Sequence, residues 1–151
     1  MILQLLAKKE NHNRLIPLNY FAFRLLEELA NLLARRVVSD QHGNVGHNDP
    51  INSIPLDPSE IDSMVTDLHS LRDDAPSGNL SATSLPESVS RLETKGNKIA
   101  AWAGRMYELA TSEAAKQLGR SAADYRVWFA GWLYFSGQLQ KLVETIFEYM
   151  R

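Results

Sequence analysis

The sequence predicts an all-α fold: a single helical-bundle domain over residues 1–151, with four principal helices and a short additional helix at the N-terminus. Three observations predict it. Apolar residues recur at alternating steps of three and four over long segments, as on one face of a helix. Patterns typical of helix starts precede several of these segments. No segment alternates apolar and polar residues over the length of a strand. The chain is long enough to bury a core without metals or disulfides.

The strongest element is the helix expected over residues 121–151. Ser121 and Asp124 form a helix-start pattern, because both side chains can accept backbone amides of the first turn. An aromatic and aliphatic stripe of this size must be covered by other helices, so we expect the bundle to be built on it. Its aromatic residues Tyr125, Trp128 and Trp132, together with Phe129, could also line a ligand-binding pocket, but their helical spacing favours a core. The stripe consists of Tyr125, Trp128, Trp132, Phe135, Leu139, Leu142, Ile146 and Met150.

The N-terminal third predicts two helices separated by a turn. Residues 1–9 are apolar and compatible with a helix, yet no capping residue precedes them. They resemble the end of a helix whose beginning is missing, which suggests a piece of a longer protein or a product of internal translation. Residues 10–14 are polar and predict a turn. A second helix is expected from Pro17, which suits a first turn, to about Val38.

Two loops and two further helices are expected in the middle of the chain. Residues 39–56 and 73–83 are rich in turn-forming residues, and we expect the longer of these two loops to be mobile. Asp57 to Glu60 form a capping box that opens a helix to about Arg72. Ser84 and Glu87 form another, which opens a helix that ends before Gly119 and is weakened near Gly96. The face expected to be buried contains Val89, Leu92, Ile99, Ala103, Met106, Ala110 and Ala114.

Composition restricts the function classes. The chain has no cysteine, so thiolate catalysis and cysteine metal sites are excluded. Its apolar runs are shorter than the roughly 20 residues of a membrane-spanning helix, and no segment has the order of a signal peptide. We therefore expect a cytoplasmic protein without a membrane partner. The net charge of −2 hides an uneven distribution, because residues 40–74 carry eight acidic residues and one basic residue. The remainder is mildly basic.

No pattern of residues predicts an enzyme, a metal site or a cofactor. His42 and His47 lie near Asp40 and Asp49 in the long loop, but their spacing matches no metal motif, so solvated loop residues are the favoured interpretation. Glu-x-x-His pairs of di-metal bundles are missing from the sequence, as are glycine-rich phosphate loops.

Basic residues gather on one face of the helix that begins at Ser84. Arg91, Lys95, Lys98 and Arg105 fall within about 80° of one another on a helical wheel, and Trp102 lies among them. Such a stripe could follow a phosphate backbone while the indole stacks on an unpaired base. The alternative is an ordinary solvated face with Trp102 at the border of the core. Arg24 and Arg35 share one face of their own helix, and Arg36 adds a neighbouring charge.

A cysteine-free helical bundle of this size, with an uncapped start at residues 1–6 and a mildly basic side, resembles the small subunit of class 1 CRISPR effector complexes of the Cascade type. In several such systems the small subunit is similar to the C-terminal domain of the large subunit and is made from an internal start. The resemblance implies a noncatalytic part of a ribonucleoprotein complex, in contact with other subunits, with copies of itself, and nonspecifically with guide RNA and target or displaced DNA. The acidic segment 40–74 would then face away from nucleic acid.

Two interpretations of the function follow. The first is a noncatalytic nucleic-acid-associated subunit, whose phosphate contacts would weaken steeply with salt. The second is a protein–protein adaptor or accessory domain of a larger protein with no role in nucleic-acid binding, in which charges only provide solubility.

Overall fold

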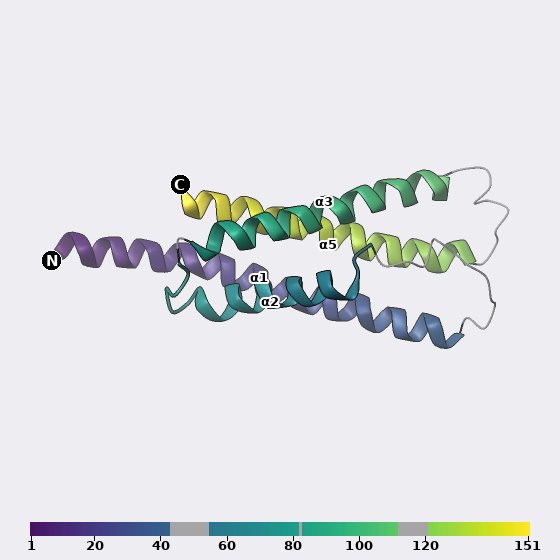
Figure 1. Ribbon diagram of the computed structural model, residues 1–151, viewed down its shortest axis with the longest axis horizontal. Helices are drawn as coiled ribbons and strands as arrows, with labels where there is room; N and C mark the ends of the chain where they lie inside the picture. Colours follow the sequence, from purple (N-terminus) through teal and green to yellow (C-terminus); the bar gives the residue numbers. More distant parts are fainter. Residues whose placement is uncertain (43–54, 82, 112–120) are drawn as a thin grey trace.

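The computed structural model describes residues 1–42, 55–81, 83–111 and 121–151, with side chains for all of these except residues 7, 11, 36–42, 109–111 and 121–128. The described residues form four helices and no strand, which confirms the predicted all-α bundle. The helices are α1 (Ile2–His42), α2 (Pro58–Asp74), α3 (Ser84–Thr111) and α5 (Ser121–Met150). They lie roughly lengthwise beside one another (Figure 1).

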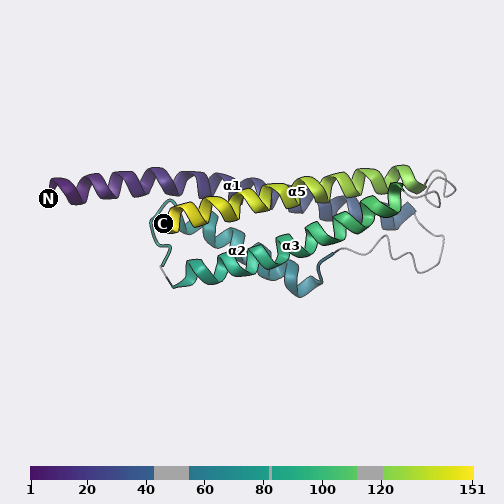
Figure 2. The ribbon, with the colours of Figure 1, turned by 90° about the horizontal axis from the view of Figure 1, so that it is seen from above.

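Helix α1 corrects the prediction for the N-terminal third. The expected short helix, the turn at residues 10–14 and the new start at Pro17 are one continuous helix of 41 residues, with Pro17 in its interior. Pro17 is exposed, while Leu15 and Leu18 on either side of it are buried. Burial of these leucines holds both sides of the proline in one helix despite the missing backbone hydrogen bond. Residues 2–14 extend beyond the other helices as an arm (Figures 1 and 2).

Helix α2 begins as its sequence predicts. The Asp57 carboxylate accepts the Glu60 amide at 2.9 Å, and the Glu60 carboxylate accepts the Asp57 amide at 2.9 Å, with Pro58 in the first turn. The helix ends at Asp74, close to the predicted Arg72. Gly78 follows with a φ of 69°, a backbone conformation that favours glycine in this turn.

Helix α3 differs from the prediction in detail. The hydroxyl of Ser81 accepts the Ser84 amide at 3.0 Å, so Ser81 does the capping expected of Ser84. The helix continues through Gly96, which is buried against Leu139 of α5, and this contact explains why the weak position does not break it. The expected end before Gly119 lies outside the described residues, as do residues 43–54 of the predicted loop 39–56, whose first residues 39–42 belong instead to α1. Helix α5 begins at Ser121, as predicted, but the side chains of Ser121 and Asp124 lie outside the described set.

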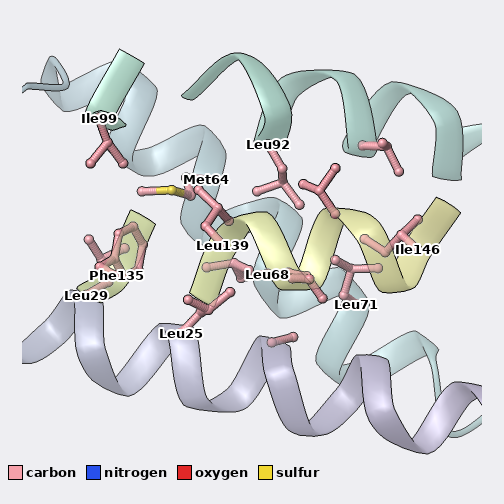
Figure 3. Packing of buried hydrophobic residues seen from close by; sticks show 14 of the residues in the cluster. Leu25, Leu29, Met64, Leu68, Leu71, Leu92, Ile99, Phe135, Leu139 and Ile146 are labelled. Atoms are coloured by element: carbon pink, nitrogen blue, oxygen red, sulfur yellow. The ribbon is translucent and has the colours of Figure 1, made fainter. Parts of the chain in front are cut away.

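Helix α5 lies at the centre of the core. Trp132, Phe135, Leu139, Leu142 and Ile146 are fully buried, as the stripe predicts, whereas Met150 at the end of the stripe is exposed. Figure 3 shows Phe135, Leu139 and Ile146 between the leucines of α1 and those of α2 and α3. On α3, Val89, Leu92, Ile99 and Ala103 are buried, as predicted. The side chains of Tyr125, Trp128, Ala110 and Ala114 lie outside the described set.

Candidate nucleic-acid interface

Arg91, the first of the predicted cations on α3, is held by a carboxylate of α2. Its Nη2 donates to Asp67 Oδ1 at 2.6 Å and its Nε to Asp67 Oδ2 at 3.0 Å. Glu87, one turn earlier on α3, lies 3.9 Å from Nη1. Hydrogen bonding to Asp67 raises the pKa of Arg91 above its ordinary value. The side chain of Asp67 is only 5% exposed, so this carboxylate depends on its basic neighbours for compensation.

Lys95 and Lys98 also face α2. Lys95 is buried; its Nζ donates to Ser63 Oγ at 3.0 Å and lies 3.9 Å from Asp67 Oδ2. Lys98 donates to both oxygens of Glu60 at 2.8 and 2.9 Å. The hydrogen bond from Lys98 is the main reason that the pKa of Glu60 lies below its ordinary value.

These three cations therefore join α2 to α3 within the chain. The acids that hold them, Glu60 and Asp67, belong to the acidic segment 40–74, which the resemblance implied would face away from nucleic acid. Cations engaged with carboxylates of their own chain have less to gain from phosphates, because each new contact would first break an existing ion pair. The fold therefore does not leave the predicted basic stripe of α3 free to bind phosphates.

Trp102 is in the core and corrects the idea of a stacking surface. It is 8% exposed, and its ring meets that of Trp132 edge to face at a centroid distance of 6.3 Å and an angle of 71°. Its indole Nε1 is buried without a hydrogen-bond partner among the described residues. A base cannot stack on a face that another helix covers. The alternative interpretation, with Trp102 packed at the core, agrees with the structure.

Arg105 is exposed on α3 and has no ion pair with a described residue. Arg105 therefore differs from Arg91, Lys95 and Lys98, which contact side chains of α2, although all four cations lie on the same face of α3. One exposed cation supplies a single phosphate contact.

Arg24 and Arg35 lie along the contact between α1 and α5. The Arg24 guanidinium donates to the hydroxyl of Tyr134 and lies 5.9 Å from the centre of that ring. Hydrogen bonding to Tyr20, followed by the effect of Tyr134, raises the pKa of Arg24. Arg35 is exposed, and its Nη1 lies 3.3 Å from the position that a Cβ would take at Gly131. We call Arg24, Arg35, Tyr134 and Gly131 the basic seam.

The sequence analysis did not single out Tyr134 and Gly131 of the basic seam, or Tyr20, which contacts Arg24 beside it. Tyr20 lies four positions before Arg24, a spacing that could have suggested their contact. Tyr134 and Gly131 could not have been found, because their proximity to α1 depends on how two helices pack. The side chain of Arg36, the remaining predicted member of the interface, lies outside the described residues.

No metal centre is evident in the described part of the chain, where no three acidic or histidine side chains gather closely enough to hold an ion. His47 and Asp49, and the side chains of Asp40 and His42, lie outside that part. An open groove of about 360 Å³ runs between α3 and α5 over Leu92, Leu139 and Phe147, with Glu93 and Glu144 at its rim. This acidic rim does not suit a polyanion.

Comparison with known proteins found no family model, no curated protein and no solved structure that matches the chain. Across the described residues, no helix combines the length and the apolar character needed to cross a bilayer.

Proposed function

We propose that this chain is a noncatalytic assembly subunit, a helical adaptor that joins protein surfaces within a larger complex. The single observation that carries this proposal is the arm of α1. Ile2 is 75% exposed and Leu6 57% exposed on a segment that extends past the rest of the bundle. Apolar side chains held away from their own core are typical of surfaces that another molecule covers.

The charges support an adaptor role more than a polyanion-binding one. Three of the four predicted cations on α3 are engaged with Glu60, Asp67 or Ser63 of α2, where they stabilise the contact between two helices. Along the chain the arm instead combines large apolar residues with Lys8, Lys9 and Arg14. Docking surfaces of proteins combine an apolar centre with a polar rim in this way.

The test is the composition of the native complex purified through a tagged copy of the chain. Leu6→Glu places a charge in the apolar part of the arm, whereas Gln4→Glu places the same charge at another exposed position of the arm. We expect Leu6→Glu to lose partner chains and Gln4→Glu to retain them, with equal helical circular dichroism for both. Retention of every partner chain by Leu6→Glu would contradict the proposal.

A second candidate is the small subunit of a Cascade-type complex, in which the chain also contacts nucleic acid. The basic seam supports it, because Arg24 and Arg35 have no carboxylate partner among the described residues and Tyr134 adds a partly exposed ring. The resemblance in size and helical pattern described above points the same way. Arg105 provides a further exposed cation on α3.

Nucleic acid retained by the native complex tests this second candidate. The double variant Arg24→Glu with Arg35→Glu should lower retention and flatten its salt dependence, because two phosphate contacts are lost. Lys98→Glu serves as the matched charge reversal at a cation that already has a partner in Glu60. Equal retention by the wild type and the double variant would leave the adaptor role without a nucleic-acid contact at the seam.

A further inference from the structure

The outward face of α1 carries a regular stripe of exposed residues. Ile2, Leu6, Lys9, Asn13, Ile16 and Tyr20 follow one another at alternating steps of four and three, and all six are exposed. We call these residues the arm stripe. It lies opposite Leu15, Leu18 and Ala22, which face the core of the chain itself. Alternating steps of three and four along a helix are the pattern by which two helices pack over a long distance.

The arm stripe has a symmetric composition. Large apolar residues stand at both ends, Ile2 and Leu6 at one and Ile16 and Tyr20 at the other, with the polar pair Lys9 and Asn13 between them. When the helix is turned end for end about residue 11, Ile2 meets Tyr20, Leu6 meets Ile16 and Lys9 meets Asn13. Apolar residues thus face apolar ones and polar residues face polar ones. Such self-complementarity is what a two-fold interface between identical chains requires.

We propose that the partner of the arm is a second copy of this chain, and that the two α1 helices pair antiparallel through the arm stripe with a two-fold axis beside residue 11. The proposal rests on the assembly role above and deepens it by naming one partner. The outer face of α1 remains uncovered at Ile16 and Tyr20, where the arm of the second copy would lie.

Other arrangements of two α1 helices match less well. A parallel pair in register places Lys9 against Lys9, which brings like charges together. An antiparallel pair shifted by one heptad sets Leu6 opposite Phe23, but it also sets Asn13 opposite Ile16. With that shift, an apolar side chain faces a polar one in the middle of the contact. The composition of the arm stripe therefore specifies direction and register as well as partner.

The exposed apolar area is about the minimum for such a pair. Five apolar side chains within the paired region are more than half exposed, and each would bury roughly 100 Å². Two copies would then remove roughly 1,000 Å² from water, at the lower end of the range of specific interfaces. The five are Ile2, Leu5, Leu6, Ile16 and Tyr20.

Cysteine cross-linking tests the register, because the chain has no cysteine of its own. Lys9→Cys and Asn13→Cys are prepared as two separate proteins, then oxidised alone and as an equimolar mixture. The proposed pairing predicts a disulfide-linked dimer in the mixture, several-fold more abundant than with either protein alone. Cross-linking of Lys9→Cys with itself to the same extent indicates a parallel pair and overturns the proposal, as does the lack of any excess in the mixture.

Sedimentation equilibrium of the unmodified chain tests the association itself. We expect twice the chain mass of 17.0 kDa for the wild type and for Gln4→Glu, and the single-chain mass for Leu6→Glu with unchanged helical content. A wild type that sediments as a single chain overturns the pairing, and if Leu6→Glu still loses partner chains from the native complex the assembly role stands without it. A dimer of the wild type together with full retention of partner chains by Leu6→Glu supports the pairing and removes the wider assembly role.

Discussion

Asp67 is the residue on which the polar contact between α2 and α3 depends. Its buried carboxylate accepts three hydrogen bonds from Arg91, one of them at 2.6 Å, and lies 3.9 Å from the ammonium of Lys95. Lys95 is itself only 7% exposed at its side chain. Removing the carboxylate would leave a lysine charge inside the protein with Ser63 as its remaining polar partner.

We therefore predict that Asp67→Asn lowers the free energy of unfolding by about 3 kcal/mol, the usual loss when one partner of a buried pair is removed. Urea denaturation followed by circular dichroism measures it. Adding Lys95→Met to Asp67→Asn should restore most of the loss, because the uncompensated charge is then gone. Arg91 is partly exposed and can return to water.

Asp62→Asn is the matched control for this prediction, since Asp62 lies on the same helix but is exposed. It should change stability by less than about 0.5 kcal/mol. If Asp67→Asn and Asp62→Asn have equal effects, the carboxylate of Asp67 does not stabilise the contact between α2 and α3.

At the residue level, the helical spacing of apolar residues predicted which side chains are buried. It did not predict which charged side chains form ion pairs. Leu139, Leu142 and Ile146 follow one helical period, and period alone identifies their buried face. The pairing of Arg91 with Asp67 joins residues 24 positions apart on different helices. A helical wheel describes one helix at a time, so it shows cations close together without showing the carboxylates of the neighbouring helix.

At the scale of the helices, the capping box of α2 connects the start of α2 with its contact to α3. Glu60 both caps Asp57 and accepts from Lys98 of α3, and the bond from Lys98 lowers its pKa. A carboxyl whose pKa is lower in the folded chain stabilises the fold at pH values above its unfolded pKa. That stabilisation is lost as the pH falls through the lower folded pKa.

We predict that Glu60→Gln is less stable than the wild type by about 1 kcal/mol at pH 7. The difference should begin to shrink as the pH falls below the ordinary glutamate pKa of 4.5, where the unfolded chain takes up the proton, and it should disappear as the pH falls through the lower folded pKa of Glu60. Thermal unfolding measured from neutral to acidic pH provides the comparison. Glu93→Gln, at an exposed carboxylate of α3, is the control, and a difference that is the same at every pH would contradict the role of ionised Glu60.

Close contact between α1 and α5 depends on the small size of Gly131. A Cβ at this position would lie 2.7 Å from Leu32 Cδ2 and 3.3 Å from Arg35 Nη1. Arg35 is exposed and can move, but Leu32 is buried and has little freedom. The strain on Leu32 must therefore exceed the gain in helix propensity that alanine provides over glycine.

We predict that Gly131→Ala lowers the free energy of unfolding by about 1 kcal/mol, whereas Gly104→Ala and Gly137→Ala raise it by about 0.5–1 kcal/mol. Neither control position has an atom within 4 Å of an added Cβ, so both report helix propensity alone. Chemical denaturation of the three variants gives the comparison. A stabilising effect at all three positions would show that Leu32 adjusts freely.

Helix α1 is the element that could not be predicted correctly from the sequence. The four principal helices could be identified from apolar period, but Pro17 and the polar residues 10–14 predicted a break that the fold does not contain. Local propensity opposes continuity at the proline by about 3 kcal/mol. Packing of Leu15, Leu18 and Ala22 against the other helices stabilises the helix on both sides of Pro17. The size of this stabilisation cannot be judged from the local sequence.

At the scale of the whole molecule, the distribution of charge has a structural role. The excess of acid in residues 40–74 includes Glu60 and Asp67, which neutralise cations of α3, so oppositely charged segments are brought together by folding. Among the described residues, cations without a carboxylate partner are found on the arm, on the basic seam, at Arg105, at Lys141 and at Arg151. On the face of α3 that the sequence favoured, Arg105 alone of the four predicted cations has no carboxylate partner among the described residues.

The molecule divides at Leu15 into a core and an arm, and this division predicts the effect of deleting residues 1–13. The side chains described in that stretch are all exposed, while Leu15 is the first buried residue among those described. Deletion should thus change the free energy of unfolding of the bundle by less than about 1 kcal/mol. Leu15→Glu should instead lower it by several kcal/mol, since it buries an unpaired charge.

Urea denaturation tests this prediction. The full-length and the shortened chain must both be monomeric, because association would add its own stabilisation to the full-length chain. The far-ultraviolet circular dichroism per molecule should decrease by the helical signal of the missing arm. A large loss of stability on deletion would mean that residues 1–13 pack on the bundle of their own chain. In that case the apolar residues of the arm would already have a partner within the molecule, and neither an adaptor surface nor a second copy would be needed to cover them.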